Sequence, residues 1–256
     1  MIHNTAIVHE NARIGKNVEI GPYAVIGEHV VIGDGTRIGA HTVIEGWTEI
    51  GRDNRIYQFA SIGADPQDLK FSGEKSHLKI GDRNMIREFV TLHRGTTEGG
   101  GMTVIGSDSL LMAYSHVAHD CILGDRVILA NAATLAGHVR IDEYAILGGL
   151  CAVHQFTRVG CHVMVSGGAM VTQDIPPYTI AQGDRAKTVG INQVGLKRRN
   201  FSEEAIRDIK QAYKLVFRSG LRMEDALAQI DAEMENSKEV AVFTAFIRES
   251  VRGVAR

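Results

Sequence analysis

The chain has 256 residues, of which 44% are hydrophobic and 23% charged, enough for a substantial core in one large domain or in one large and one small domain. The net charge of −2 gives no overall basis for binding nucleic acid or an anionic membrane surface. The first residues lack the basic and apolar regions of a secretion signal, and no run approaches the eighteen or so apolar residues of a spanning helix, so we expect no integral membrane protein.

An aliphatic residue recurs every six positions over residues 8–62, 80–92 and 105–171. Helices have a period of about 3.6 and simple strands of about 2, so neither produces this repeat. A period of six is typical of a parallel β-helix, whose coils bury one branched aliphatic residue per side. The hexapeptide families that it resembles form left-handed, three-sided helices with about eighteen residues per coil. We therefore predict an all-β, left-handed parallel β-helix over residues 1–186.

Two segments interrupt the repeat. Residues 63–79 (GADPQDLKFSGEKSHLK) are long enough to leave the β-helix as a loop, and residues 93–104 (HRGTTEGGGMTV) are rich in glycine. Loops on a rigid scaffold often carry binding or catalytic residues, although either segment could also be a decoration of the surface.

The repeat is lost after residues 174–186, and helical spacing replaces it. In FSEEAIRDIKQAYKLVFRSG, Ser202 is a candidate N-cap, apolar residues follow at helical spacing, and Gly220 is a stop signal. RMEDALAQIDAEM and SKEVAVFTAFIRESVRG predict two further helices. We expect a small α-helical domain over residues 187–256.

Histidines gather at one predicted edge of the β-helix. In AYSHVAHDC, two histidines stand three residues apart, and successive additions of eighteen to position 119 reach positions 137 and 155. The strings AHD, AGH and HQF should therefore stack on coils about 4.8 Å apart. A general base with a substrate groove, a zinc site and a group of unrelated surface imidazoles are the alternatives at this point. The edge carries His116, His119, Gly137, His138, His154 and Gln155.

Longer strings resemble one enzyme family. SIGADPQDLKFSGE, the segment from GSDSLLMAYSHVAHDC to VGCHVMV, and PPYTIAQGDRA with GLKRRNFS resemble the acyl-(acyl-carrier-protein)–UDP-N-acetylglucosamine O-acyltransferases, which open lipid A synthesis in Gram-negative bacteria. The resemblance runs from the first coil to the last helix. It implies transfer of a 3-hydroxyacyl group from an acyl-carrier-protein thioester to the 3-hydroxyl of UDP-N-acetylglucosamine.

The resemblance also implies roles for individual residues. His119 is the expected general base, since histidine titrates near neutral pH, and the N–H of Gly137 the expected oxyanion donor. Asp120 is expected to orient the base, although adjacent strand residues point to opposite faces, and a structural role at a coil corner is the alternative. The sugar and acyl groove matches His116, His138, His154 and Gln155, the nucleotide-sugar contacts match Gln67, Asp68 and Lys70, and the UDP contacts match Asn192, Arg198 and Arg199. Without the resemblance, a solvated basic turn is the better interpretation of the two arginines.

Gly167 matches the position at which the family selects acyl-chain length. It lies about 2.7 coils beyond His119, or roughly 13 Å along the axis. A chain parallel to the axis, at about 1.25 Å per carbon, reaches that height after about ten carbons. A glycine there would let a longer donor pass, and the resemblance implies one near 3-hydroxymyristoyl. A simple coil corner is the alternative role.

One departure concerns the acceptor. Val194 stands where the family carries an acidic residue that helps to fix the uridine, so a 3-amino sugar acceptor, which would give an amide, stays open. A zinc enzyme of the carbonic anhydrase type on the same fold is the second hypothesis, and a non-catalytic scaffold is the third.

The expected partners follow from the leading hypothesis. They are the acyl carrier protein, UDP-N-acetylglucosamine and two further copies of the chain in a homotrimer, without nucleic acid. We expect no metal and no cofactor, because 4′-phosphopantetheine arrives on the carrier protein. Three cysteines without a C-x-x-C pair indicate a reducing compartment, so we expect a cytoplasmic location.

Overall fold

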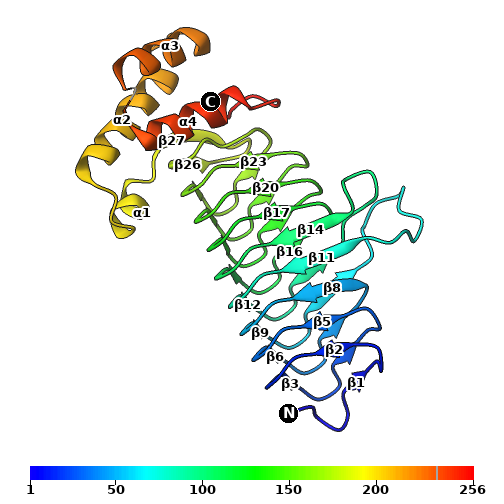
Figure 1. Cartoon of the computed structure of the whole chain (residues 1–256). Helices are drawn as coiled ribbons and strands as arrows, with labels where there is room; N and C mark the ends of the chain where they lie inside the picture. Colours follow the sequence, from blue (N-terminus) through cyan, green and yellow to red (C-terminus); the bar gives the residue numbers. More distant parts are fainter. Residues whose placement is uncertain (235) are drawn as a thin grey trace.

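The computed structural model describes residues 1–234 and 236–256, and most of them form a three-sided parallel β-helix (Figure 1). The nine-stranded sheet contains β1 (Ile7–Val8), β4 (Val25–Ile26), β7 (Val43–Ile44), β10 (Ser61–Ala64), β13 (Thr91–His93), β16 (His116–Val117), β19 (Thr134–Leu135), β22 (Ala152–Val153) and β25 (Met170–Val171). The eight-stranded sheet contains β2 (Arg13–Ile14), β5 (Val31–Ile32), β8 (Trp47–Ile50), β11 (His77–Ile80), β14 (Met102–Ile105), β17 (Ile122–Leu123), β20 (Arg140–Ile141) and β23 (Arg158–Val159). The ten-stranded sheet contains β3 (Glu19–Ile20), β6 (Arg37–Ile38), β9 (Arg55–Ile56), β12 (Met85–Ile86), β15 (Leu110–Leu111), β18 (Ile128–Leu129), β21 (Ile146–Leu147), β24 (Met164–Val165), β26 (Thr179–Gln182) and β27 (Lys187–Ile191).

The register of the sheets fixes the length of a coil. Ile26 lies beside Ile44, eighteen residues later, and this offset recurs in most pairings. Two coils are longer: His77 pairs with Trp47, thirty residues earlier, and with Met102, twenty-five residues later. The two predicted interruptions therefore enlarge two successive coils. Their first and last residues pair into the sheets, so the irregular parts are residues 65–76 and 94–101.

The sixfold repeat builds the core. From β3 onward the second side chain of each two-residue strand is buried, and so is the second side chain of the longer β10 and β13; Ile26, Ile44, Ile62 and Leu92 are at most 1% exposed. Branched aliphatic side chains fill this interior because burial of their apolar surface contributes most of the stabilisation. The all-β parallel β-helix predicted from the repeat is confirmed.

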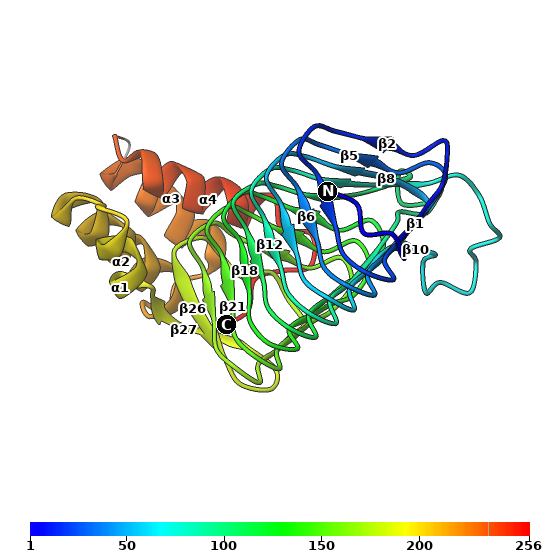
Figure 2. The same cartoon turned by 90° about the horizontal axis from the view of Figure 1, so that it is seen from below.

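Residues with a positive φ turn the chain between the sheets and define three edges. Edge A carries Tyr23, His41, Phe59, Phe89, Tyr114, Ala132, Leu150 and Gly168; edge B carries Asn17, Gly35, Asp53, Arg83, Asp108, Arg126, Tyr144, His162 and Tyr178; edge C carries Asp120, His138 and Phe156. The rings of edge A from Tyr23 to Tyr114 stack with centroids 4.9 to 5.2 Å apart, close to the strand spacing of about 4.8 Å. Figure 2 shows the triangular outline of the coils and the loops that leave one corner.

The C-terminal helices pack at the end formed by the last coils (Figure 1). The helices are α1 (Gln193–Arg198), α2 (Glu203–Phe217), α3 (Met223–Glu233) and α4 (Lys238–Arg248). The three predicted helices are present, and Ser202 caps α2 by accepting from the N–H of Ala205. Helix α1 was not predicted, because six residues are too few to show a period. A core around Phe243 holds the helices together.

The predicted domain boundary at residue 186 lies five residues early. Strand β27 pairs antiparallel with β26 and so continues the ten-stranded sheet. The sequence could not show this, because an antiparallel return carries no sixfold repeat. Across residues 1–234 and 236–256, no helix has the length and apolar content needed to cross a bilayer.

Candidate active site

The side chains of His119 and Asp120 meet at edge C. Nδ1 of His119 lies 2.8 Å from Oδ2 of Asp120, and because a carboxylate only accepts, Nδ1 donates; in the neutral ring Nε2 then keeps its lone pair. The expectation that adjacent residues point to opposite faces was wrong here. These residues lie in the turn between β16 and β17, and Asp120 has a φ of 59°, so strand alternation does not apply.

The carboxylate of Asp120 is held by the second loop. Its side chain is 1% exposed, and it accepts from the backbone N–H of Thr96 at 2.9 Å and from the Thr96 hydroxyl at 2.7 Å. The N–H of Asp120 donates to the hydroxyl of Thr103 at 2.8 Å. Neither threonine was predicted as a site residue, because in the sequence this loop is distinguished only by its glycine content. Asp120 therefore turns the corner and also anchors the ring of His119.

Gly137 lies directly beside the ring of His119, on the next coil. The N–H of His138 donates to the carbonyl of His119 at 3.0 Å, which confirms the predicted stacking. A Cβ at position 137 would lie 2.5 Å from Cε1 and 2.6 Å from Nε2 of His119. In the described residues no group accepts a hydrogen bond from the N–H of Gly137, so this donor is available beside Nε2 of His119.

Three more imidazoles surround this pair. His138 packs edge-on against His119, with centroids 5.1 Å apart, and stacks on Phe156. His116 makes a 2.7 Å hydrogen bond to Thr91 and packs edge-on against His93, which sequence analysis did not select. Burial lowers the pKa of His116 and of His138, and it lowers that of His93 to about 4. At neutral pH these rings are uncharged and can orient a polar substrate by hydrogen bonds.

The first loop reaches edge C. Asp68 Oδ1 accepts from the N–H of Lys70 at 3.0 Å, and Lys70 in turn contacts Glu98, whose neighbour Gly99 packs against the Asp120 carboxylate. The ammonium of Lys70 pairs with Glu98 of the second loop at 2.9 Å, and this hydrogen bond raises the Lys70 pKa. Gln67 is exposed on the same loop. A cationic donor therefore stands near the histidines, where an anionic part of a substrate could bind.

His154 and Gln155 complete edge C. Both are exposed, and Nδ1 of His154 lies 3.1 Å from the carbonyl oxygen of Gln155 and 3.4 Å from a guanidinium nitrogen of Arg252. Of the fourteen predicted site residues, the structure brings seven to edge C and three to the loop beside it.

The other four predicted residues lie elsewhere. Arg199 covers the ring of Tyr144 on edge B, 4.2 Å from its centroid, and Asn192 donates to the carbonyl of His162 on the same edge while capping α1. Arg198 is exposed on α1. These residues do not lie on the edge that carries His119 in the same chain.

Gly167 lies on edge A, where the N–H of Gly168 donates to the carbonyl of Gly149. The number of coils between His119 and Gly167 gives the distance along the axis but not the position around the β-helix. Forty-eight residues are two coils and two further sides, so Gly167 stands two sides away from edge C. A Cβ there would meet only Gly149, whose carbonyl oxygen would lie 3.2 Å and whose nitrogen 3.9 Å away, and would otherwise point into open space.

One trio in the described part of the chain could hold a metal ion, namely His119, Asp120 and His138. Zinc needs ligand atoms that converge on one point. Nδ1 of His119 and Oδ2 of Asp120 instead face each other at hydrogen-bond distance, so these two atoms bind each other and not a common ion. The arrangement fits an oriented base better than a ligand set.

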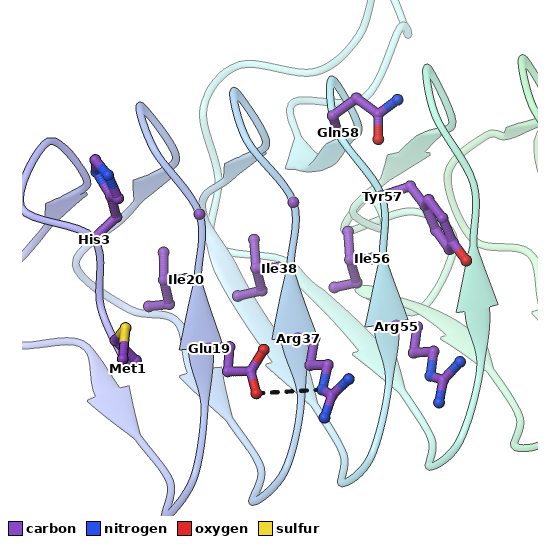
Figure 3. A pocket seen from close by; sticks show the side chains of 12 residues that line it. Met1, His3, Glu19, Ile20, Arg37, Ile38, Arg55, Ile56, Tyr57 and Gln58 are labelled. Carbon is purple, nitrogen blue, oxygen red and sulfur yellow. Dashed lines mark ion pairs between the residues drawn. The ribbon is translucent and has the colours of Figure 1, made fainter.

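A cavity of about 630 Å³ lies at the other end of the molecule (Figure 3). It is a hollow on the first three strands of the ten-stranded sheet, lined in part by Glu19, Arg37, Arg55 and Tyr57. Glu19 and Arg37 form an exposed ion pair there. None of the predicted site residues lines this cavity, so it is not part of the site on edge C.

Comparisons with known proteins agree with this architecture. Residues 29–63 and 102–137 match the bacterial transferase hexapeptide family, and residues 174–255 match the second domain of the UDP-N-acetylglucosamine O-acyltransferases. The chain is 55% identical over its full length to a Janthinobacterium protein named acyl-(acyl-carrier-protein)–UDP-N-acetylglucosamine O-acyltransferase, and 54% identical to one of that name from Herminiimonas arsenicoxydans; each alignment covers 99% of the relative.

Solved structures extend the comparison. The UDP-N-acetylglucosamine acyltransferase of Bacteroides fragilis superposes with a TM-score of 0.98 at 46% identity, and both chains are covered completely. LpxA of Acinetobacter baumannii gives a TM-score of 0.97 at 43% identity, covering all of this chain and 99% of the other. The hexapeptide repeats and these superpositions establish the left-handed sense of the β-helix and the small C-terminal helical part.

Proposed function

The chain belongs to the family of acyl-(acyl-carrier-protein)–UDP-N-acetylglucosamine O-acyltransferases, and from that premise we propose how its residues perform the reaction. It is an O-acyltransferase that uses an acyl carrier protein as donor and UDP-N-acetylglucosamine as acceptor in lipid A biosynthesis. The observation that carries the proposed mechanism is the His119–Asp120 pair with its free nitrogen beside the N–H of Gly137.

His119 is the general base. As the 3-hydroxyl oxygen of the sugar attacks the thioester carbonyl carbon, Nε2 takes the hydroxyl proton. The negative charge moves to the carbonyl oxygen, where the N–H of Gly137 donates a hydrogen bond. When the C–S bond breaks, the pantetheine sulfur leaves and receives the proton from His119, which restores the base. Asp120 holds the ring through Nδ1 in each step and stabilises the imidazolium.

The loop beside edge C binds the nucleotide sugar. Lys70 contacts a phosphate after leaving Glu98, and Gln67 and Asp68 contact the sugar. The neutral rings of His116 and His138 line the groove with His154 and Gln155. The carrier protein brings its own pantetheine arm, so the reaction needs no further cofactor and no metal.

A second copy of the chain completes the site. The expected UDP contacts lie on edge B and the expected length-selecting residue lies on edge A, whereas the base lies on edge C. The ten-stranded sheet spans edges A and B, and the outward residues of its later strands are apolar and partly exposed: Met85, Leu110, Ile128, Ile146, Met164 and Ile180. When this face lies against edge C of a neighbour, a closed homotrimer results with three shared sites.

Mixed oligomers test the shared site. A mixture of His119→Ala and Arg198→Ala chains, unfolded and reassembled together, should recover part of the wild-type activity. In a mixed trimer, the intact His119 of an Arg198→Ala chain can face the intact Arg198 of a His119→Ala chain. No recovery in mixed trimers would mean that each chain holds a complete site.

The direct test of function is to incubate the protein with UDP-N-acetylglucosamine and a ladder of 3-hydroxyacyl carrier-protein thioesters and to weigh the products. Formation of the ester supports the proposal, and absence of any acylated sugar contradicts it. Metal analysis of the active protein distinguishes this proposal from the zinc hypothesis, because only a zinc enzyme requires stoichiometric zinc.

The acceptor is tested by offering the 3-amino sugar in parallel. Val194 is 63% exposed on α1 and supplies no carboxylate to the nucleotide, so a preference for the amine would revise the acceptor. The three cysteines are free, and we place the reaction in the cytoplasm.

A further inference from the structure

The glycine-rich second loop closes directly over the carboxylate of Asp120. A Cβ at Gly95 or Gly99 would overlap the carboxylate, so the backbone of the loop lies directly against the charged group. Thr96, between these glycines, is 4% exposed. This close cover excludes water from the carboxylate and leaves the loop itself to supply its hydrogen bonds.

The hydrogen bonds of Thr96 have a fixed direction. Its hydroxyl oxygen accepts from the N–H of Gly99 at 3.1 Å, so its single proton points to Oδ2 of Asp120 at 2.7 Å. Its backbone N–H donates to Oδ1 at 2.9 Å. Oδ2 is the same oxygen that receives Nδ1–H of His119.

We propose that Thr96 is a positioning residue of the acyl transfer, acting through Asp120 on His119; this role rests on the proposed function. Two donors on the carboxylate fix its rotation and therefore the direction of Oδ2. That direction keeps the proton of His119 on Nδ1 and aims Nε2 beside Gly137. The chain of contacts runs from Thr96 to Asp120 to His119, and Thr96 itself touches no substrate.

The same loop also carries Glu98, the partner of Lys70. Only one residue therefore separates Thr96, which fixes the base, from Glu98, which must release Lys70 to a phosphate. The second loop therefore contacts both the first loop, through Glu98, and Asp120, through Thr96.

The test compares Thr96→Val, Thr96→Ser, Asp120→Asn and the double variant Thr96→Val/Asp120→Asn, with steady-state kinetics for both substrates. Thr96→Val should lower kcat about tenfold, because a hydrogen bond to a charged group is lost, and should leave both KM values within about twofold. Thr96→Ser keeps the hydroxyl and should restore kcat. In the Asp120→Asn background the valine should cost nothing more, since the pathway is already broken.

The matched control is Thr42→Val. Thr42 is fully buried in an early coil, and its hydroxyl donates to the carbonyl of Tyr57 at 3.0 Å, so the change tests loss of a buried threonine hydroxyl away from edge C. It should leave kcat unchanged. An unchanged kcat in Thr96→Val, an equal loss in both backgrounds, or a serine that fails to restore kcat would each refute the role. If Thr96→Val has a lower melting temperature than the wild type, the test rests on Thr96→Ser, whose kcat must equal that of the wild type. A wild-type protein without any transfer activity would instead refute the proposed function.

Discussion

Replacing Gly137 by alanine should disable the base while leaving the fold intact. The added Cβ would lie 2.5 Å from Cε1 and 2.6 Å from Nε2 of His119. Carbon atoms in favourable contact lie about 3.5 Å apart, so the ring must move by about 1 Å. The backbone of residue 137 accepts an alanine, because its φ is not in the left-handed region.

That displacement is large for a catalytic group. Moving the ring by about 1 Å stretches the 2.8 Å bond from Nδ1 to Asp120 beyond hydrogen-bond length. A misplacement of this size costs about 100-fold in rate. The N–H of residue 137 is retained, so the loss reports the position of His119 and not the oxyanion donor. Overpacking should cost about 1–3 kcal/mol of stability.

Initial rates of acyl transfer, measured by mass spectrometry of the sugar product, give the answer. Gly190→Ala is the matched control, since a Cβ there meets no atom within 4 Å, and it should behave like the wild type. A folded Gly137→Ala protein with a normal kcat would refute the placement of His119 against this glycine.

Three further predictions concern the nucleotide end, the acyl chain and the dependence of stability on pH. Lys70→Ala and Arg198→Ala should raise KM for UDP-N-acetylglucosamine more than KM for the acyl donor, and equal effects on both constants would remove these residues from the nucleotide end. Gly167→Met should shift preference toward donors of about ten carbons, since its side chain would extend into the groove that a longer tail needs; unchanged preference for the longest donor, or equal loss of all donors, would show that Gly167 does not select chain length. Burial lowers the pKa of His93 and of His162 to about 4, below the unfolded value of about 6.5, so their contribution to stability is complete above pH 6.5 and is lost as the pH falls toward 4. Each should cost on the order of 3 kcal/mol at pH 4. Denaturant unfolding from pH 4 to 7 measures this loss, which His162→Phe should reduce; a flat profile would contradict it.

The sequence predicts the parts of this fold that follow a period. Every sixth aliphatic residue enters the core, so Ile26 and Ile44 could be placed in register without a structure. The same count places Gly137 beside His119. The count was incomplete for Gly167, which lies two full coils and twelve residues beyond His119. It gave the height of Gly167 along the axis but not the side of the β-helix on which it lies.

Features outside the period could not be predicted. Thr96 reaches Asp120 across twenty-four residues through a loop with no repeat, and only the folded loop brings them together. The turn at Asp120 has a positive φ that a strand pattern does not reveal, so strand alternation alone predicts side chains of His119 and Asp120 on opposite faces. His93 lies where β13 enters the second loop, and its burial depends on packing against His116.

The central claim is that His119 is the base, and single-turnover transfer by His119→Ala tests it most directly. Loss of a general base should slow the step by about 10²–10⁴-fold. The oligomer and the melting temperature should change little, because the side chain lies at an edge outside the buried core. A correctly folded His119→Ala protein that acylates UDP-N-acetylglucosamine at a rate near that of the wild type would contradict the account.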